Sequence, residues 1–209
     1  MFPFPPICVI APAMKKFLFD KEIYVISAVP EVLVKAITDG ARVVQLRDKE
    51  APEAVIRQKA KELLSLKKFH QFVFIINDYP ELAASIGADG VHIGQDFATV
   101  TARRIIGPGR ILGKTTHNLL QANQAYHDGA DYISAGPVFA TPTKPGRLPV
   151  GLEYVREVAK ADIGIPFVAI GGLDIHNAQE VVKAGARTLG VVRANNQIKE
   201  LLTILQGYQ

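Results

Sequence analysis

The chain has 209 residues, of which 48% are hydrophobic and 21% charged, so it is long enough to bury a substantial core. Its net charge of +4 comes from dispersed basic residues, which favours small anionic ligands over a nucleic acid. The one cysteine, Cys8, excludes an internal disulfide and a cysteine-based metal cage. No apolar stretch is long enough to cross a bilayer and the first residues lack an export-signal pattern, so we expect a cytoplasmic protein without a membrane partner.

Short runs rich in Val and Ile alternate along the chain with longer amphipathic stretches. The expected strands lie, in chain order, at 22–27, 42–48, 72–78, 90–94, 110–116, 131–139, 166–172 and 188–195, and a stretch with helical spacing follows each of them. Apolar strands that alternate with helices are typical of a parallel sheet covered by helices. The pattern predicts a single α/β domain, a (β/α)8 TIM barrel over residues 21–209 with an N-terminal extension at 1–20, and an open doubly wound sheet is the alternative.

Polar residues stand where several of the expected strands end. The carboxyl ends of all strands in a closed barrel meet at one rim, which carries the chemistry in barrel enzymes. The polar residues at these ends are Gln45, Arg47, Lys49, Asn77, Asp78, Gln95, Asp96, Lys114, Thr115, Thr116 and His117. We therefore expect the active site at this rim.

Cations and acids occur together in this set. Arg47, Lys49 and Lys144 suit a substrate with several phosphate oxygens, because a guanidinium grips two oxygens and ammonium groups act as point charges. Acids would repel such a substrate unless a bound Mg²⁺ lay between them, since Mg²⁺ prefers carboxylate, water and phosphate oxygens. Asp78 and Asp96 are the expected ligands, although Asp78 would also suit the cap of the helix that follows it.

A second anion site is expected beside the last two strands. Gly171 and Gly172 end one expected strand, and Val192 and Arg193 end the next. Flexible glycine backbone beside a helix start offers free N–H groups, and the corresponding loops of barrels commonly bind a monophosphate.

Two aromatic positions and one histidine are assigned to the interior. His92 alternates with apolar residues in its strand, and we expect it inside the barrel with its ring nitrogens hydrogen-bonded. Tyr132 and Phe139 suit stacking on a heterocycle, but packing in the core is the commoner use of such residues.

Several motifs together resemble the thiamine phosphate synthase family, which shares its barrel with the TenI-type thiazole tautomerases. They are "VVQLRDK", "IINDYPELAASIGADGVHIGQD", "GKTTHNLLQA", "ADYISAGPVFATPTKPG", "IPFVAIGGL" and "AGARTLGVVRAN". The resemblance runs from about residue 21 to the end of the chain. It implies a transferase of thiamine biosynthesis that condenses 4-amino-2-methyl-5-(diphosphooxymethyl)pyrimidine with a thiazole phosphate, giving thiamine phosphate and diphosphate, with Mg²⁺ as cofactor.

The resemblance also implies site residues at the matching positions. It implies Gln45, Leu46, Arg47, Asp48, Lys49, Asn77, Thr115 and Lys144 for the pyrimidine diphosphate, Thr141, Pro142 and Thr143 for the thiazole, and Gly172, Val192 and Arg193 for the thiazole phosphate. Arg47, Lys49 and Lys144 are the expected catalytic residues, because they would stabilise the departing diphosphate. Asp78 matches one family ligand of Mg²⁺.

The chain departs from the family pattern at three places. Phe97 stands where the family carries its second acidic Mg²⁺ ligand, and Asp96 is one residue earlier. Adjacent residues at the end of a strand point differently, so Asp96 replaces that ligand only where the backbone turns it inward. Tyr79 replaces an acid common after "IND", and Arg193 replaces a small residue.

These departures leave other functions open. A TenI-like tautomerase would use the same barrel and thiazole phosphate site, with His117 as general acid or base and no metal. A non-catalytic protein that binds the thiazole phosphate as a regulator is a further alternative. The sequence does not decide the oligomeric state, and a homo-oligomer is compatible with it.

Overall fold

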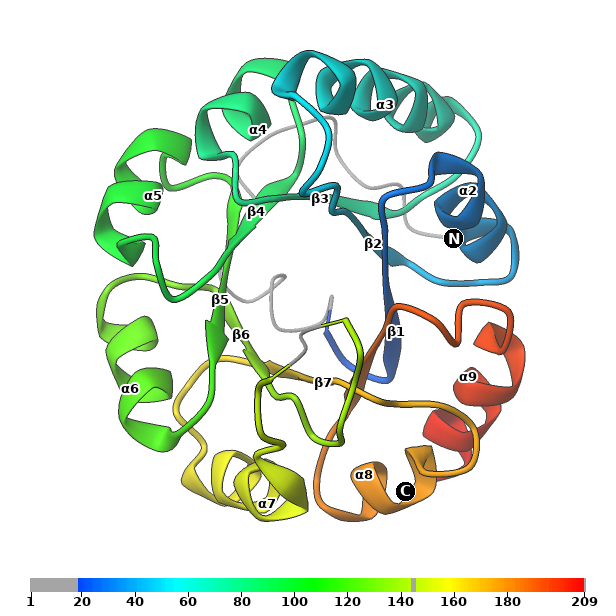
Figure 1. Cartoon of the computed structure of the whole chain (residues 1–209), viewed down its shortest axis with the longest axis vertical. Coiled ribbons are helices and arrows are strands. Elements are labelled where there is room, and N and C mark those ends of the chain that lie inside the picture. Colours follow the sequence, from blue (N-terminus) through cyan, green and yellow to red (C-terminus); the bar gives the residue numbers. More distant parts are fainter. Residues whose placement is uncertain (1–18, 144–145, 209) are drawn as a thin grey trace.

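A closed barrel of parallel strands forms the centre of the chain, with helices around it (Figure 1). The computed structural model describes residues 19–143 and 146–208. Within them the strands are β1 (Glu22–Ser27), β2 (Val43–Leu46), β3 (Val73–Asn77), β4 (Gly90–Ile93), β5 (Ile111–Thr116), β6 (Tyr132–Ala135), β7 (Phe167–Ile170) and β8 (Thr188–Val191). The prediction of a (β/α)8 barrel is confirmed, and the open doubly wound sheet is wrong because β1 pairs with both β2 and β8.

A helix follows each strand on the outside of the barrel. The helices are α2 (Pro30–Thr38), α3 (Glu53–Ser65), α4 (Pro80–Ile86), α5 (Thr99–Ile106), α6 (Leu119–His127), α7 (Gly151–Ala161), α8 (Ala178–Lys183) and α9 (Ile198–Gly207), and the short 3-10 helix η1 (Leu66–Lys68) continues α3. Among the described residues, no helix combines the length and the apolar composition that a membrane span requires.

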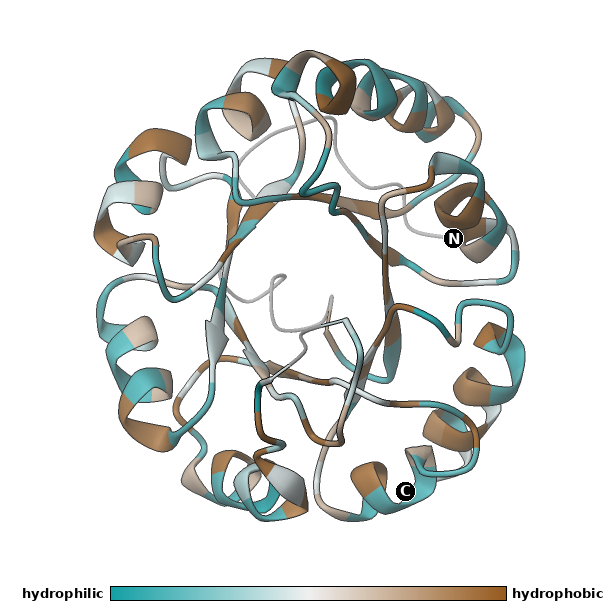
Figure 2. Ribbon diagram, viewed as in Figure 1, coloured by the Kyte–Doolittle hydropathy of each residue, from teal (hydrophilic) through white to brown (hydrophobic). Residues whose placement is uncertain are grey.

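Two apolar layers hold the barrel together. Alternate residues of a strand point to opposite faces, so one set packs against the helices and the other fills the interior. Ile76 and Leu46 belong to the outer layer, whereas Val43, Ile75 and Ile111 belong to the interior. Figure 2 shows mostly apolar strands surrounded by helices that carry both apolar and polar residues.

The lower part of the interior is aromatic. Phe19 stacks on Tyr132 with 4.3 Å between ring centroids, and Tyr24 lies edge-on to both rings. Phe19 belongs to the predicted N-terminal extension, so at least this residue packs inside the barrel. Residues 1–18, with Cys8, lie outside the described part of the chain, and the boundary at residue 20 stays a prediction.

Burial predicts which leucines stabilise the fold. Leu63 on α3 is fully buried, whereas Leu120 on α6 is 80% exposed. Leu63→Ala should lower the free energy of unfolding by about 2–5 kcal/mol because it leaves a cavity, and the matched control Leu120→Ala should change it by less than about 0.5 kcal/mol. Urea unfolding measures both, and equal losses would contradict the described packing.

Candidate active site

A cavity of about 340 Å³ opens at the carboxyl ends of the strands. Of the residues predicted from the sequence, those that line it are Gln45, Arg47, Asn77, Thr115, His117, Thr141, Thr143, Gly171, Gly172, Val192 and Arg193. Predicted residues of the second, third and fifth to eighth strand-helix units therefore converge here. A volume of this size accommodates a small organic ligand.

The end of β2 and the loop after it divide their residues between the cavity and the helix layer. Gln45 and Arg47 face the cavity, whereas the Leu46 side chain is buried in the outer apolar layer, as strand alternation requires. Asp48 also points away from the cavity: its Oδ2 accepts a 2.7 Å hydrogen bond from Lys59 Nζ, and its Oδ1 accepts from the N–H groups of Glu50 and Ala51.

These contacts make Asp48 an anchor of the loop. The Lys59 ammonium holds the pKa of the Asp48 carboxyl below its usual value. Lys59 Nζ also donates a 3.0 Å hydrogen bond to Ala28 O, so one side chain of α3 ties two rim loops together. The side chains of Leu46 and Asp48 do not line the cavity, so any contact that they make with a ligand would come from their backbone.

Each carboxylate oxygen of Asp78, at the end of β3, has a partner. Its Oδ2 forms a 3.0 Å ion pair with Lys49 Nζ, and its Oδ1 accepts from Gly94 N–H at 3.3 Å. Helix α4 has Tyr79 as its N-cap residue and no side-chain cap, so the alternative that Asp78 caps this helix is wrong. The positive φ of 63° at Asp78 is uncommon for a residue other than glycine, and such strain is concentrated at functional sites.

Asp96 turns back toward Asp78 in the loop after β4. A Cβ atom built on Gly94 would lie 2.4 Å from Asp96 Oδ1 and 3.9 Å from Asp78 Oδ1, so both carboxylates approach the same side of Gly94. Lys114 holds this loop, because its Nζ donates to Gly94 O at 2.8 Å and to Phe97 O at 2.7 Å. The Phe97 side chain packs against the outer apolar layer.

Burial affects the charge of Lys114. Desolvation lowers the pKa of its ammonium, and the nearby carboxylates of Asp96 and Asp128 oppose that shift. In the described residues no three histidine, cysteine or acidic side chains gather as a metal cage. Two carboxylates are nevertheless the number that Mg²⁺ commonly takes from a protein when it shares the rest of its shell with water and phosphate.

His117 is held at the rim by backbone contacts. Its Nδ1 lies in hydrogen-bond contact with Gly136 O, and its backbone N–H donates to Gln121 Oε1 at 2.8 Å. A carbonyl oxygen only accepts, so Nδ1 carries a proton in this contact. The side chain lines the cavity.

Steric crowding explains why two glycines follow β7. Gly171 and Gly172 have φ values of +105° and +70°, which favour glycine. A Cβ at Gly171 would lie 2.5 Å from Pro137 Cα, and one at Gly172 would lie 2.8 Å from Phe139 Cβ. The glycines therefore let the β6–α7 loop cross directly over the end of β7.

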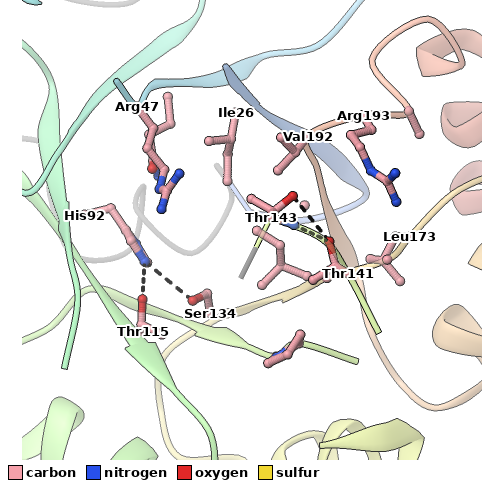
Figure 3. A pocket seen from close by; sticks show the side chains of 18 of the residues that line it. Ile26, Arg47, His92, Thr115, Ser134, Thr141, Thr143, Leu173, Val192 and Arg193 are labelled. Atoms are coloured by element: carbon pink, nitrogen blue, oxygen red, sulfur yellow. Dashed lines mark hydrogen bonds between the residues drawn. The ribbon is translucent and has the colours of Figure 1, made fainter. Parts of the chain in front are cut away.

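Free backbone donors stand beside these glycines. In the described ranges, the N–H groups of Gly172, Val192 and Arg193 donate to no protein acceptor. Buried or half-buried N–H groups are normally paired, so donors left open in a cavity wall suit an anionic ligand. Figure 3 shows Arg193 and Arg47 on opposite sides of the cavity with Thr141 and Thr143 between them.

Two other predicted residues, Pro142 and Lys49, do not belong to this lining. Pro142 is exposed, and Lys49 stands outside the cavity beside Asp78. Lys144 lies outside the described residues, so its role stays a prediction. Thr141 and Thr143 are linked to each other by a hydrogen bond of 3.3 Å between their hydroxyl oxygens.

The cavity also contains residues that were not predicted as site residues. They are Ile26, His92, Ser134, Gly136, Pro137, Ile170, Leu173, Asp174, Gly190, Ala194 and Gln197. His92 was predicted to be a hydrogen-bonded residue of the interior, and this is confirmed by bonds from both of its ring nitrogens. Strand alternation with Tyr132 would have identified Ser134, which is two residues further along β6.

The fold and this cavity define a (β/α)8 barrel with anion-binding geometry at its carboxyl rim. The family model described as TMP-TENI, thiamine monophosphate synthase, matches residues 17–194. The chain belongs to this family, and the resemblance seen in the motifs is confirmed.

Individual relatives agree with the family match. A thiamine-phosphate synthase of Gloeobacter violaceus is 47% identical over 165 residues, which are 78% of this chain and 48% of that protein. One of Shouchella clausii is 42% identical and covers 78% of this chain and 79% of its own. The structure of a thiamine phosphate pyrophosphorylase from Pyrococcus furiosus has a TM-score of 0.81 at 30% identity, covering 93% of this chain and 98% of that one.

Coverage differs among these relatives. The chain spans about half the length of several curated relatives that it matches, including the 46% of a Synechocystis thiamine-phosphate synthase to which it is 44% identical. The similarity therefore concerns the barrel, which carries all the residues discussed above.

A pair of glycine substitutions tests the role of the close contacts around Gly172. Gly87 and Gly172 both have a left-handed backbone, but a Cβ at Gly87 meets nothing within 4 Å. Alanine at either position should cost about 1–2 kcal/mol of stability from the backbone, and Gly172→Ala should cost about 1–3 kcal/mol more because of its close contacts. Gly172→Ala should also weaken binding of inorganic phosphate by roughly tenfold, or ~1.4 kcal/mol, in calorimetry. Equal behaviour of the two variants would contradict a phosphate site at Gly172.

Proposed function

We propose that the protein is a thiamine-phosphate synthase, which joins an aminopyrimidine methyl diphosphate to a thiazole monophosphate. The observation that carries this proposal is the presence of two separate anion-suited sides on one cavity. Arg47 lies on one side, two residues before Lys49, which pairs with Asp78, and the open N–H groups of Gly172, Val192 and Arg193 lie on the other. The names of the curated relatives support the same activity.

The proposed reaction breaks one bond and forms another. The bond between the pyrimidine methylene carbon and the diphosphate oxygen breaks, and the diphosphate leaves with the electron pair. The thiazole nitrogen then bonds to that carbon with its own lone pair, so no general base is required. A cationic methylene centre and a growing negative charge on the leaving group follow from this order of events.

The protein's own contribution is electrostatic and geometric. Arg47, Lys49 and Lys144 stabilise the charge that develops on the diphosphate, and preorganised groups of this kind commonly contribute about 2.7–4 kcal/mol each. Lys144 is assigned here from the resemblance. The open N–H groups on the other side hold the thiazole phosphate, so that the ring nitrogen stays close to the reacting carbon.

The carboxylates on the diphosphate side suit a Mg²⁺ ion. Asp78 and Asp96 offer oxygen ligands on the same side of Gly94, and Asp78 is already paired with a cation in Lys49, which shows that its surroundings accept positive charge. Bound Mg²⁺ would act as a Lewis acid for the diphosphate oxygens. Asp96, held in its loop by the Lys114 contacts, replaces the acid that the family carries at the position of Phe97.

The activity test uses the pure protein and both phosphorylated substrates. Thiamine phosphate and diphosphate should form only when Mg²⁺ is added, and chromatography measures both products. Isomerisation of a thiazole carboxylate phosphate without metal would instead identify the tautomerase activity. Binding of the thiazole phosphate without either product would identify a regulator.

Four variants test the assigned residues. Lys49→Ala and Lys144→Ala should each lower turnover by about 10²–10³-fold because they remove a charge from the departing diphosphate, whereas His117→Ala should lower it far less. Asp78→Asn should raise the Mg²⁺ concentration needed for half-maximal turnover. The opposite ranking, with His117→Ala the most damaging, would favour the tautomerase.

A further inference from the structure

A continuous chain of polar side chains crosses the barrel interior beneath the cavity. Gln45 Nε2 donates to Tyr24 Oη at 2.6 Å, and Tyr24 Oη lies 2.8 Å from Tyr132 Oη. Tyr132 Oη lies 2.9 Å from His92 Nδ1, and His92 Nε2 lies 3.0 Å from Thr115 Oγ1. Ser134 Oγ lies 3.5 Å from the same nitrogen.

The two ends of this chain reach the cavity, and its middle does not. Gln45, His92, Thr115 and Ser134 line the cavity, whereas Tyr24 and Tyr132 are fully buried below it. Figure 3 shows His92 directed toward Thr115 and Ser134 in the wall. The tyrosines therefore contact no ligand, and they connect two groups that do line the site.

The surrounding residues leave room for this chain. A Cβ at Gly113 of β5 would lie 2.3 Å from Tyr132 Oη and 2.4 Å from His92 Nδ1, so the phenol and the imidazole meet in the space that a side chain would fill. Phe19 stacks beneath Tyr132 and seals the lower side. Burial raises the pKa of both phenols, so each keeps its proton.

Hydrogen-bond counting leaves two concerted arrangements of these protons. With Gln45 N–H donating to Tyr24, the Tyr24 hydroxyl donates to Tyr132, and the Tyr132 hydroxyl donates to His92 Nδ1. His92 then carries its proton on Nε2 and donates to Thr115, whose own hydroxyl proton is left for the cavity. The reverse arrangement also satisfies every group, but only when all of them reverse together.

We propose that Tyr24 and Tyr132 are positioning residues that couple the amide of Gln45 to the imidazole of His92. The coupling makes the cavity present a carbonyl acceptor at Gln45 together with a hydroxyl donor at Thr115. This pattern recognises a ring that carries an amino donor and a ring-nitrogen acceptor, as a 4-aminopyrimidine does. This inference rests on the proposed function. It gives a reason why the site would bind the amino form of the pyrimidine ring in preference to the oxo form.

The coupling has a consequence for selectivity. A ligand with a reversed pattern, such as the 4-oxo analogue with its ring N–H and carbonyl, would require the whole chain of hydrogen bonds to reverse. Cutting the chain at Tyr132 lets the two ends turn independently. Selectivity between the amino and oxo rings should then fall even though the lining residues are unchanged.

The test compares Tyr132→Phe with Tyr154→Phe. Tyr154 is a matched control, because its buried hydroxyl bonds Thr116 Oγ1 and Asn118 O on the outer side of β5, away from the cavity. Both variants lose one buried phenol hydroxyl. Only Tyr132→Phe interrupts the chain between Gln45 and His92.

Two measurements are made on each variant. In ¹⁵N NMR without ligand, His92 should be one Nε2–H tautomer in the unaltered protein and in Tyr154→Phe, and a mixture in Tyr132→Phe. In calorimetry, 4-amino-5-hydroxymethyl-2-methylpyrimidine should bind at least about a hundredfold more tightly than its 4-oxo analogue, and Tyr132→Phe should reduce this ratio by roughly tenfold.

Kinetics separate this inference from the proposed function. With an active protein, Tyr132→Phe should raise KM for the pyrimidine diphosphate and leave KM for the thiazole phosphate unchanged. Unaltered His92 tautomer and unaltered amino-to-oxo ratio in Tyr132→Phe would overturn the inference while the synthase activity stands. Absence of thiamine phosphate from the unaltered protein would overturn the proposed function, and the NMR comparison would still decide whether the two tyrosines set the His92 tautomer.

Discussion

Hydrogen bonding between β1 and β8 closes the sheet, and the site depends on that closure. Once the barrel is closed, each strand residue points either into the interior or toward the helices, and all carboxyl ends meet at one rim. Gln45 and Arg47 thereby enter the cavity, while Leu46 between them packs against helices. The same rule places Thr115 in the cavity, whereas Lys114 reaches outward and back to the loop that carries Asp96.

Charge is distributed around this rim in a way that separates two ligand anions. On one side, carboxylates and cations alternate, since Asp78 pairs with Lys49 and Asp48 with Lys59. On the other side the donors are mainly backbone N–H groups next to two glycines. A larger residue at either glycine would collide with the β6–α7 loop. A metal-bound diphosphate would suit the first side and a monophosphate the second, as the proposed two-substrate condensation requires.

Below the rim, the interior is neither wholly apolar nor open to solvent. Burying hydroxyls, an amide and an imidazole is unfavourable unless each is hydrogen-bonded. Here every link from Gln45 to Thr115 is 3.0 Å or shorter, and Ser134 Oγ lies 3.5 Å from His92 Nε2. The aromatic rings around them supply the packing that an apolar core would give. The ends of this polar chain, Gln45 and Thr115, line the cavity above it, so the chain links hydrogen-bonding groups on two sides of the site.

The sequence by itself determined the architecture and half of the residues that line the cavity. The alternation of apolar runs with helical spacing fixes a (β/α)8 barrel, and strand ends rich in polar residues identify Gln45, Arg47, Asn77 and Thr115, because position in a strand decides which rim a residue reaches. The family motifs added Thr141 and Thr143, which also line the cavity. Only the tertiary structure decided that Asp96 folds back toward Asp78, that Asp48 anchors its loop through Lys59, and that Tyr24 meets Tyr132. These are contacts between residues far apart in the chain or turned by loop backbone, and neither periodicity nor spacing carries information about such directions.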